Sequence, residues 1–383
     1  MSKKIAWILV ALLVIVLAAV LLQSGIKPAV KSDSLDKLSL PEGFRIDVFA
    51  GSLGGSQISY PGTNPGARMM LLKDNVLFVT ITGEGRVVAL PDKNGDKKAD
   101  EAITFIDNLN NPHGIDFYNG WFYIAEENRV IRVKDSDGDL IADGDAEVLI
   151  NDLPAGGHFT RTIKIHNNSL YVSTGSSCNV CYEKDERRAA IIRCNLDGKE
   201  CKIFARGLRN AVGFVIHPVT GKMYATENGR DGLGEDVPPD EINLVEEGKD
   251  YGFPVCYGKN IHDTDFDKNT SDSCIDKAPS LIDLQAHSAP LGLAFYYGDN
   301  FPQEYRGDLF VAFHGSWNRR ESTGYKIVSI DMNTFTVKDF ATGWLAGSNV
   351  LGRPVDIIVA QDGSLFVSDD NAGKIYRIYY EGK

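Results

Sequence analysis

The sequence predicts an all-β fold, a six-bladed β-propeller, with a transmembrane or signal helix at the N-terminus. Two observations predict this architecture: a short strand–turn–strand phrase recurs six times, and the chain opens with a long apolar run. The 383 residues are 43% hydrophobic and include 38 glycines, a composition that suits a large core with many tight turns. The formal net charge of −12 argues against nucleic acid as a partner.

Each repeat contains a hydrophobic strand, a turn and a second strand written LFV, FYI, LYV or MYA. The copies begin near Leu72, Gly114, Thr162, Val212, Leu291 and Pro354. One such unit cannot bury a core alone, so we expect six small sheets arranged radially around a central funnel. Residues 44–50 also alternate as a strand, and we expect them to pair with the sheet that ends at residues 376–380. Almost no helix is expected beyond the N-terminal segment.

The N-terminus carries a membrane signal. Lys3 and Lys4 precede an uninterrupted apolar run over residues 5–22, which is near the minimum length of a spanning helix, roughly 18 to 20 residues. No clear cleavage site follows, so the pattern favours an uncleaved anchor, with a cleaved signal peptide as the alternative. The leading lysines predict that the rest of the chain is extracytoplasmic, anchored to the cell membrane or secreted if cleaved. The expected parts are residues 1–24 as anchor or signal peptide, 25–40 as a polar tether and 41–383 as the propeller.

The six cysteines are consistent with an oxidising compartment. They fall into three pairs that are close in sequence, and local pairing is the simplest of the 15 possible connectivities. The expected disulfides are Cys178–Cys181, Cys194–Cys201 and Cys256–Cys274. For the first pair, a redox or metal-binding role is the alternative to a disulfide that ties a small loop.

Two acidic loops, after the first and second repeats, share the pattern D-x-[DN]-G-D-x-x-x-D. Oxygen ligands at alternate positions can wrap a calcium ion, and the glycine permits the sharp turn. The alternative is a turn rich in Asp and Gly that holds no metal. The predicted ligands are Asp92, Asn94, Asp96 and Asp100 in one loop and Asp135, Asp137, Asp139 and Asp143 in the other, in a structural role.

Several polar clusters interrupt the repeats. They lie at residues 157–161, 207–210, 228–231, 239–243, 287, 314–320 and 352–356. Most come just before an inner strand or just after an LFV-type strand, and in a propeller these offsets converge on one axial face. Singly they are modest signals, because His158 could be a hydrogen-bonded loop histidine and Trp317 a packing residue. Together they suggest an anionic ligand and a proton acceptor.

Long ordered motifs then carry a resemblance. The runs GHFTRTIKI, ARGLRNAVGFVIHPVTGKMYATENGRDGLGEDVPPDEIN, YGFPVCYG, AFHGSWNR and GRPVDIIV resemble the pyrroloquinoline quinone-dependent glucose/sorbosone dehydrogenase family, most closely its sorbosone branch. The similarity extends from about residue 40 to the C-terminus. It implies a six-bladed propeller that binds pyrroloquinoline quinone and Ca²⁺ over the funnel and oxidises an aldose or an aldehyde by hydride transfer.

The resemblance also implies roles for individual residues. His158 matches the family's general base, and Arg209 and Asn210 match the catalytic pair beside the quinone carbonyls. Gly229 and Arg230 match positions whose main-chain carbonyls bind the calcium ion. The remaining cofactor-binding positions are Arg68, Arg319 and Arg353.

One departure concerns the segment Gly175-Ser176-Ser177, where the soluble glucose enzymes carry Gly-Asp. This difference puts glucose itself in doubt as the substrate. The chain has no CxxCH haem motif, so electrons are expected to leave to an external acceptor, a membrane quinone or a cytochrome. The alternative functions are a calcium-dependent lactonase and a non-catalytic propeller that binds a glycan or a protein.

Overall fold

The computed structural model describes residues 34–55, 65–268 and 274–382. The chain divides into two compact units, residues 1–36 and 37–383, and the second holds the whole propeller. The predicted N-terminal helix lies outside the described residues, as does most of the predicted tether. In the part of the chain that is described, no helix is both long enough and apolar enough to cross a membrane.

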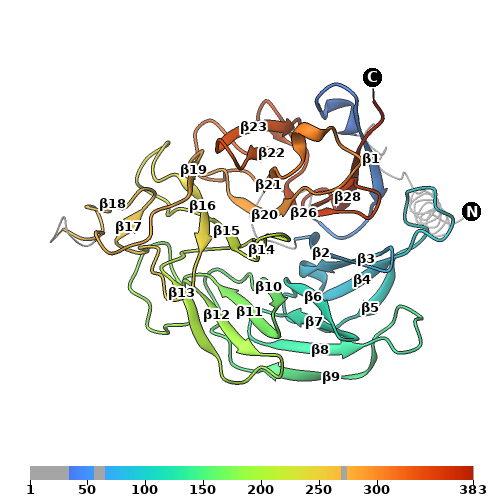
Figure 1. Ribbon diagram of the computed structural model, residues 1–383, viewed down its shortest axis with the longest axis horizontal. Helices are drawn as coiled ribbons and strands as arrows, with labels where there is room; N and C mark the ends of the chain where they lie inside the picture. The colour runs from blue at the N-terminus through green and yellow to red at the C-terminus, as the bar shows by residue number, and fades with distance from the viewer. Residues whose placement is uncertain (1–33, 56–64, 269–273, 383) are drawn as a thin grey trace, which may run out of the picture. The chain divides into compact units, whose positions relative to one another are not determined.

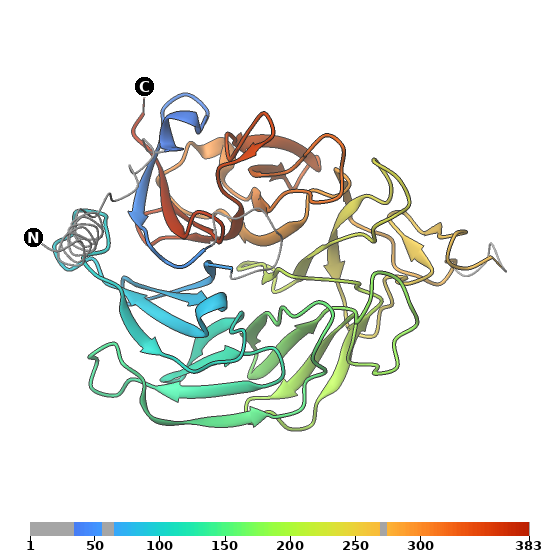
Figure 2. The ribbon, with the colours of Figure 1, turned by 180° about the vertical axis from the view of Figure 1, so that it is seen from behind.

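The described part of the second unit contains six four-stranded antiparallel sheets arranged radially, as predicted (Figures 1 and 2). From the innermost strand outward, the first three blades are β2 (Ala67–Lys73), β3 (Val76–Ile81), β4 (Arg86–Leu90) and β5 (Ile103–Ile106); β6 (Ile115–Tyr118), β7 (Trp121–Ala125), β8 (Val130–Lys134) and β9 (Asp143–Ile150); and β10 (Ile163–His166), β11 (Ser169–Thr174), β12 (Ala190–Asn195) and β13 (Lys202–Arg206). The next three are β14 (Phe214–Ile216), β15 (Met223–Glu227), β16 (Asp240–Val245) and β19 (Ile282–Leu284); β20 (Pro290–Phe295), β21 (Leu309–Phe313), β22 (Lys326–Asp331) and β23 (Thr336–Ala341); and β26 (Pro354–Val359), β27 (Leu365–Asp369), β28 (Lys374–Tyr380) and β1 (Phe44–Ala50).

The last blade joins the two ends of the propeller sequence. Strand β1 pairs antiparallel with β28, so that Phe44 lies opposite Tyr380 and Ile46 opposite Ile378. The predicted pairing is therefore confirmed. Phe44 is only 4% exposed, and its ring packs edge-on against Phe301 and Phe340 of the preceding blade. This contact fixes the closing strand to its neighbouring blade.

The apolar cores lie between adjacent blades. The LFV-type strands are buried on both faces, and all five residues of β21 are buried, which explains why they appear as continuous hydrophobic runs rather than alternating ones. Between the first two blades, Phe78 and Phe105 meet Phe122 with ring centroids 4.7 and 4.6 Å apart. Because every blade shares a core with its neighbours, the loops at the axis rest on a rigid support.

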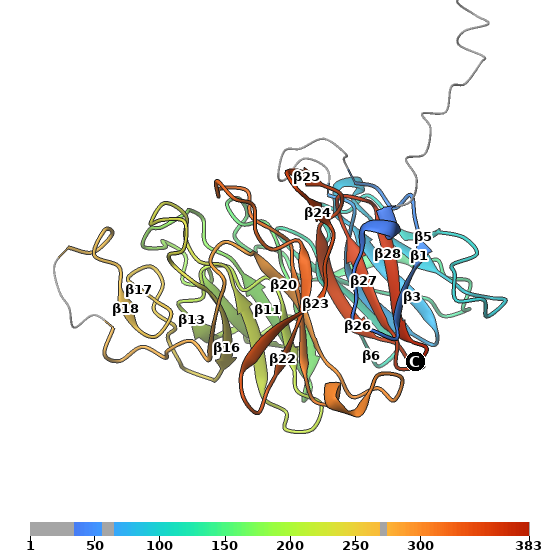
Figure 3. The same cartoon turned by 90° about the horizontal axis from the view of Figure 1, so that it is seen from above.

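Among the described residues helix is nearly absent, as predicted for the chain beyond its N-terminal segment. The helical elements among the described residues are the 3₁₀ turns η1 (Ser34–Lys37), η2 (Thr82–Glu84) and η3 (Gln303–Tyr305). Two short hairpins are inserted between blade strands: β17 (Cys256–Tyr257) with β18 (Ile261–His262), and β24 (Leu345–Ala346) with β25 (Asn349–Val350). The β17–β18 hairpin projects sideways from the blades of the propeller (Figure 3).

All three predicted disulfides are present: Cys178–Cys181, Cys194–Cys201 and Cys256–Cys274. The first closes a loop between β11 and β12, the second joins β12 to the residue before β13, and the third anchors the inserted hairpin. Each bridge therefore ties a local loop, and none joins two blades.

Candidate active site

A pocket of about 270 Å³ opens at one end of the propeller axis. Its polar lining is Arg68, His158, Thr160, Arg209, Asn210, Asn228, Asp231, Asp240, His287, His314, Asn318, Arg353, Asp370 and Asn371, with Pro65, Phe159, Val212, Gly229, Ala289, Leu291, Gly315 and Trp317. Most of these residues come from loops that precede an inner strand or follow the second strand of a blade. Arg68 and Leu291 lie at the start of the inner strands β2 and β20, and Asp240 is the first residue of β16. The structure thus brings together the clusters that the sequence placed at those offsets.

His158 lies in the loop before β10, and its hydrogen bonds define its tautomer. Nδ1 is 2.9 Å from the carbonyl oxygen of Ser176, which can only accept, so Nδ1 carries the proton. The Ser176 hydroxyl donates to the carbonyl of Cys178 at 2.7 Å and lies 3.0 Å from the same Nδ1. The unprotonated Nε2 is left to accept a proton. Burial and the nearby Arg209 guanidinium lower the pKa of His158 to about 4, so the imidazole is neutral near pH 7.

Gly175 explains how this histidine meets its neighbour in the next blade. A Cβ at this position would lie 2.6 Å from both Asn210 Oδ1 and the Cβ of His158. Only glycine permits this approach without displacing one of the two side chains. Ser176 takes the place where the soluble glucose enzymes are expected to have an aspartate, so here a carbonyl and a hydroxyl orient His158 without a negative charge.

Arg209 and Asn210 lie before β14, and both are buried. Arg209 donates through Nε to the carbonyl of Asn179 (2.8 Å), through Nη2 to the side chain of Asn179 (2.9 Å) and through Nη1 to the carbonyl of Asn228 (3.0 Å). A guanidinium has five N–H donors, so these bonds leave two. Asn210 Nδ2 donates to Asn228 Oδ1 at 3.3 Å. The pair is held in place by main-chain carbonyls and by the side chains of Asn179 and Asn228, while donors of Arg209 remain for a ligand.

A second cluster lies across the pocket, and the sequence only partly anticipated it. Asp370 pairs with Arg68 and accepts a hydrogen bond from His314 Nε2 at 2.8 Å. Arg353 donates to the carbonyls of His314 (3.1 Å) and Gly315 (2.7 Å). Burial and the nearby Arg353 lower the pKa of His314 to about 4. Although burial opposes it, the hydrogen-bonded His314, followed by Arg68 and Arg353, holds the pKa of Asp370 well below its usual range.

Arg68 has an unsatisfied donor in this cluster. Its side chain is 7% exposed, and its buried Nε has no hydrogen-bond partner among the described residues. Buried donors are nearly always paired in native proteins, so the orphan Nε is an indication of a missing acceptor. His314 lies in the 314–320 cluster seen in the sequence. Asp370 directly follows an LFV-type strand, so the same offset could have identified it.

Two predicted site residues have other partners. Arg319 does not line the pocket; it pairs with Asp236 at 3.0 Å and donates to the carbonyl of Ala286 at 3.3 Å. The Arg230 side chain pairs with Asp263 from the inserted segment. The adjacent Gly229 does line the pocket, and its N–H donates to Asp240 Oδ1 at 2.9 Å. Burial raises the pKa of Asp240 to about 7.

The two acidic loops lie away from this pocket. They connect the third and fourth strands of their blades, and antiparallel alternation puts those connections on the opposite face. In both loops the carboxylates accept bonds from backbone N–H groups: Gly95 donates to Asp92 and Gly138 to Asp135, both at 2.8 Å. In the second loop, oxygens of Asp135, Asp137 and Asp139 lie within 4.8 Å of one another. Calcium binding here stays a prediction.

Trp317 lies at the rim of the pocket and is 66% exposed. The sequence left open whether this residue packs in the interior, and the structure excludes that interpretation. A large aromatic ring exposed beside a pocket is available to a ligand.

A six-bladed propeller whose axial pocket combines a neutral imidazole with three guanidinium groups has the features of a quinone-dependent sugar dehydrogenase. The chain belongs to the TrAA12-like family, whose model matches residues 65–381. The predicted membership of the quinone-dependent sugar dehydrogenases is thereby confirmed, and the chain is an enzyme of the oxidoreductase class.

Individual relatives and solved structures are similar to this chain. An uncharacterized protein of Borreliella burgdorferi is 40% identical over 297 residues, which cover 73% of this chain and 78% of that protein. The pyrroloquinoline quinone-dependent pyranose dehydrogenase of Coprinopsis cinerea is 25% identical over 415 residues, covering 89% of this chain but only 54% of that protein. The solved holo form of the quinone domain of pyranose dehydrogenase from the same species superimposes with a TM-score of 0.73 at 21% identity, covering 89% of this chain and 97% of that one, and shows the shared fold.

Proposed function

We propose that the chain is an exported quinoprotein that oxidises an aldose sugar or an aldehyde by hydride transfer to pyrroloquinoline quinone, with His158 as general base. The observation that carries the proposal is the composition of the axial pocket. One imidazole with an available Nε2 lone pair shares the pocket with the guanidinium groups of Arg68, Arg209 and Arg353. These are the groups that an anionic quinone and a hydroxyl proton require.

The donors of the pocket fit this cofactor. Pyrroloquinoline quinone carries three carboxylates, and guanidinium groups bind carboxylates through paired hydrogen bonds. Arg68 offers its unpartnered Nε, and Arg209 and Arg353 each retain N–H groups beyond their bonds to the protein. When bound, the quinone supplies the hydride acceptor, and donors at its carbonyl oxygens make it a better one. Arg209 and Asn210 are the residues proposed for that polarisation.

The charges of the pocket support a bound cation as well. The guanidinium groups of Arg68, Arg209 and Arg353 are largely balanced by the carboxylates of Asp231 and Asp370, together with Asp240, which is only partly ionised near pH 7 because burial raises its pKa to about 7. A tricarboxylate would therefore bring an excess of negative charge into the pocket. A calcium ion beside Gly229 and Arg230, held by their main-chain carbonyls, would offset that excess. Arg319 retains its proposed role in cofactor binding, although reaching a ligand would require it to release Asp236.

The protein's own part in the reaction is the movement of one proton. His158 accepts the hydroxyl proton of the substrate at Nε2, while the carbonyl of Ser176 holds Nδ1–H and keeps the ring oriented. Its low pKa keeps the ring neutral at physiological pH, which a general base requires. A positioned base of this kind contributes about 10²–10⁴-fold to the rate.

The proposed substrate is a small aldose or an aldehyde of the sorbosone type. Trp317 offers an exposed ring at the rim, which can cover the apolar face of a sugar. His158 is oriented by the carbonyl and hydroxyl of Ser176, where an aspartate is expected in the soluble glucose enzymes, and this difference separates the two sites. Electrons are proposed to pass to an external acceptor, a membrane quinone or a cytochrome.

Export is supported by the sequence and by the disulfides. The three bridges are typical of an oxidising compartment, and the apolar N-terminal run with its leading lysines suits a membrane anchor. We place the propeller outside the cytoplasm, anchored through residues 1–24 or secreted if this segment is removed.

The test is reconstitution of the purified full chain with CaCl₂ and pyrroloquinoline quinone, followed by dye reduction with a panel of aldoses and aldehydes. We expect a quinone absorption spectrum that stays with the protein and turnover that His158→Gln abolishes without releasing the quinone. The absence of both a bound spectrum and dye reduction with every substrate would reject the proposal. Lactone hydrolysis without added quinone would indicate a hydrolase instead.

A further inference from the structure

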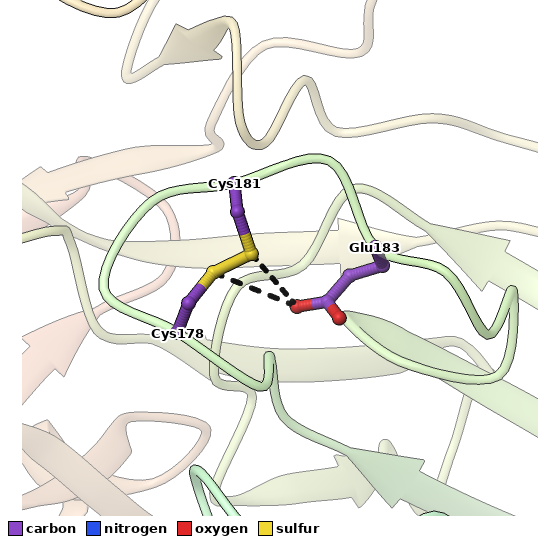
Figure 4. A group of neighbouring side chains, drawn as sticks. All are labelled: Cys178, Cys181 and Glu183. Carbon is purple, nitrogen blue, oxygen red and sulfur yellow. Dashed lines mark hydrogen bonds between the residues drawn. A yellow bond between two sulfur atoms is a disulfide. The ribbon is translucent and has the colours of Figure 1, made fainter.

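The loop that joins β11 to β12 is braced on both sides of residue 179. Cys178 and Cys181 form a disulfide around Asn179 and Val180, and we call residues 178–181 the disulfide loop. The carboxylate of Glu183 approaches both sulfur atoms, at 3.9 and 3.8 Å (Figure 4). The same carboxylate accepts hydrogen bonds from the backbone N–H and the hydroxyl of Ser177, both at 2.7 Å. The disulfide loop is therefore fixed at its start and at its end.

Asn179 is exposed, yet its polar side-chain atoms have protein partners. Its Oδ1 accepts from Arg209 Nη2 at 2.9 Å and from the backbone N–H of Asp231 at 2.8 Å, and its Nδ2 donates to the carbonyl of Asp231 at 3.0 Å. Its main-chain carbonyl accepts from Arg209 Nε at 2.8 Å. The amide cannot be reversed, because the guanidinium and the backbone N–H only donate and the carbonyl only accepts.

These bonds join two parts of the candidate site. Nε and Nη2 form one edge of the Arg209 guanidinium, and the whole of that edge is held by Asn179. Asp231 immediately follows Gly229 and Arg230, whose carbonyls are proposed to bind calcium. A third connection starts at the base of the loop, where the carbonyl of Cys178 accepts from the Ser176 hydroxyl beside His158.

A role in bulk stability does not account for this arrangement. Asn179 is exposed and contributes nothing to the apolar cores. Its disulfide spans a sequence separation of three residues, and the stabilisation from a disulfide grows with the length of the loop it closes. The Cys178–Cys181 disulfide constrains little of the unfolded chain. It does restrict the local conformations of Asn179, the residue that contacts Arg209.

We propose that Asn179 is a positioning residue that aligns Arg209 and the 229–231 segment for cofactor binding, and that the disulfide loop holds Asn179 in place. This inference rests on the proposed function, since the ligand is the quinone with its calcium ion. Asn179 is not catalytic itself. It sets the direction of the two N–H groups that Arg209 has left for the quinone.

The test compares Asn179→Ala with a matched control, Asn195→Ala. Asn195 is also an exposed asparagine beside a local disulfide, and it donates to Glu200 at 3.0 Å, away from the pocket. In the full chain with CaCl₂, affinity for pyrroloquinoline quinone is measured by fluorescence titration, and kcat and KM are measured at saturating quinone. We expect Asn179→Ala to weaken quinone binding roughly tenfold and to lower kcat, with an unchanged sugar KM and melting temperature. Asn195→Ala should match the unsubstituted protein in all of these.

A second pair of variants tests the role of the disulfide loop. Cys178→Ala/Cys181→Ala should weaken quinone binding, whereas Cys194→Ala/Cys201→Ala should leave the affinity unchanged. If the first double variant does not fold, as judged by circular dichroism, Asn179→Ala alone decides the question. Quinone affinity and kcat in Asn179→Ala equal to those of Asn195→Ala would overturn the positioning role alone. An unsubstituted protein that binds no quinone would overturn the proposed function, and this inference with it.

Discussion

Replacing His158 with glutamine should change how the stability of the protein depends on pH. The pKa of His158 is about 4 in the folded protein, against an ordinary value of 6.5, because burial and Arg209 disfavour the imidazolium. One pKa unit corresponds to about 1.4 kcal/mol. The difference between the two pKa values of His158 therefore corresponds to roughly 3 kcal/mol of folding free energy in total. Glutamine preserves much of the shape of the side chain but cannot take up a proton.

The direction follows from proton binding in the two states. Between pH 6.5 and about 4 the unfolded chain protonates this histidine and the folded protein does not, so the contribution to stability is complete above pH 6.5 and is lost as the pH falls towards 4. The slope approaches about 1.4 kcal/mol per pH unit inside that window. From pH 7 to pH 4.5, the wild type should lose about 2.5 kcal/mol more of its unfolding free energy than His158→Gln loses.

Urea unfolding followed by tryptophan fluorescence and circular dichroism at pH 7, 5.5 and 4.5 measures this difference. Other groups that titrate in the same range are common to both proteins and cancel in the comparison. Parallel curves for wild type and variant would show that His158 is not a buried neutral imidazole. His158 would then not be a base that is ready to accept a proton at neutral pH.

Four further predictions concern the site, the ring closure and the acidic loops. Arg353→Ala should weaken quinone binding roughly 10- to 150-fold, because hydrogen bonds to charged groups are worth about 1.5–3 kcal/mol; an unchanged titration would remove Arg353 from the cofactor site. Trp317→Ala should raise the sugar KM several-fold without altering the melting temperature, because the ring is 66% exposed; an unchanged KM would exclude contact with the sugar. Phe44→Ala should cost about 3–5 kcal/mol in urea unfolding, since its buried ring fixes the closing strand, and a loss below 1 kcal/mol would contradict that role. Asp137→Asn with Asp139→Asn should reduce the rise in melting temperature caused by CaCl₂ while turnover stays unchanged; a rise equal to that of the unsubstituted protein would show that the second loop holds no structural calcium.

The sequence was sufficient for the architecture because the fold repeats. Six copies of one phrase predicted the blades, and the alternation of residues 44–50 predicted that β1 would complete the last one. The disulfides were equally accessible, since each cysteine lies close to its partner along the chain. Local patterns decide features of this kind, and they can be read without knowledge of distant contacts.

The candidate site was less accessible, because pairing across blades decides which polar groups meet. Arg319 was expected at the cofactor, and the sequence did not reveal that it pairs with Asp236. Only the main-chain carbonyl of Arg230 was assigned a role, and its side chain pairs with Asp263, 33 residues further along. Conversely, the offset of Asp370 after an LFV-type strand placed it on the pocket face, but the sequence did not show that Arg68 of the first blade would pair with it. The same limit applies to Asn179, whose importance rests entirely on two residues from the next blade.

The pairing of β1 with β28 has a consequence for how the protein is made. The ring of blades cannot close until β28 has been synthesised and transported. The reason is that β1 pairs with β28, and β28 is the last strand of the propeller along the chain. Until then, the edge of β1 that pairs with β28 has no hydrogen-bonding partner. We expect closure to be a late and slow folding event, since contacts between segments so far apart in sequence form slowly, and a permuted chain that begins at β2 and ends at β1 should close faster.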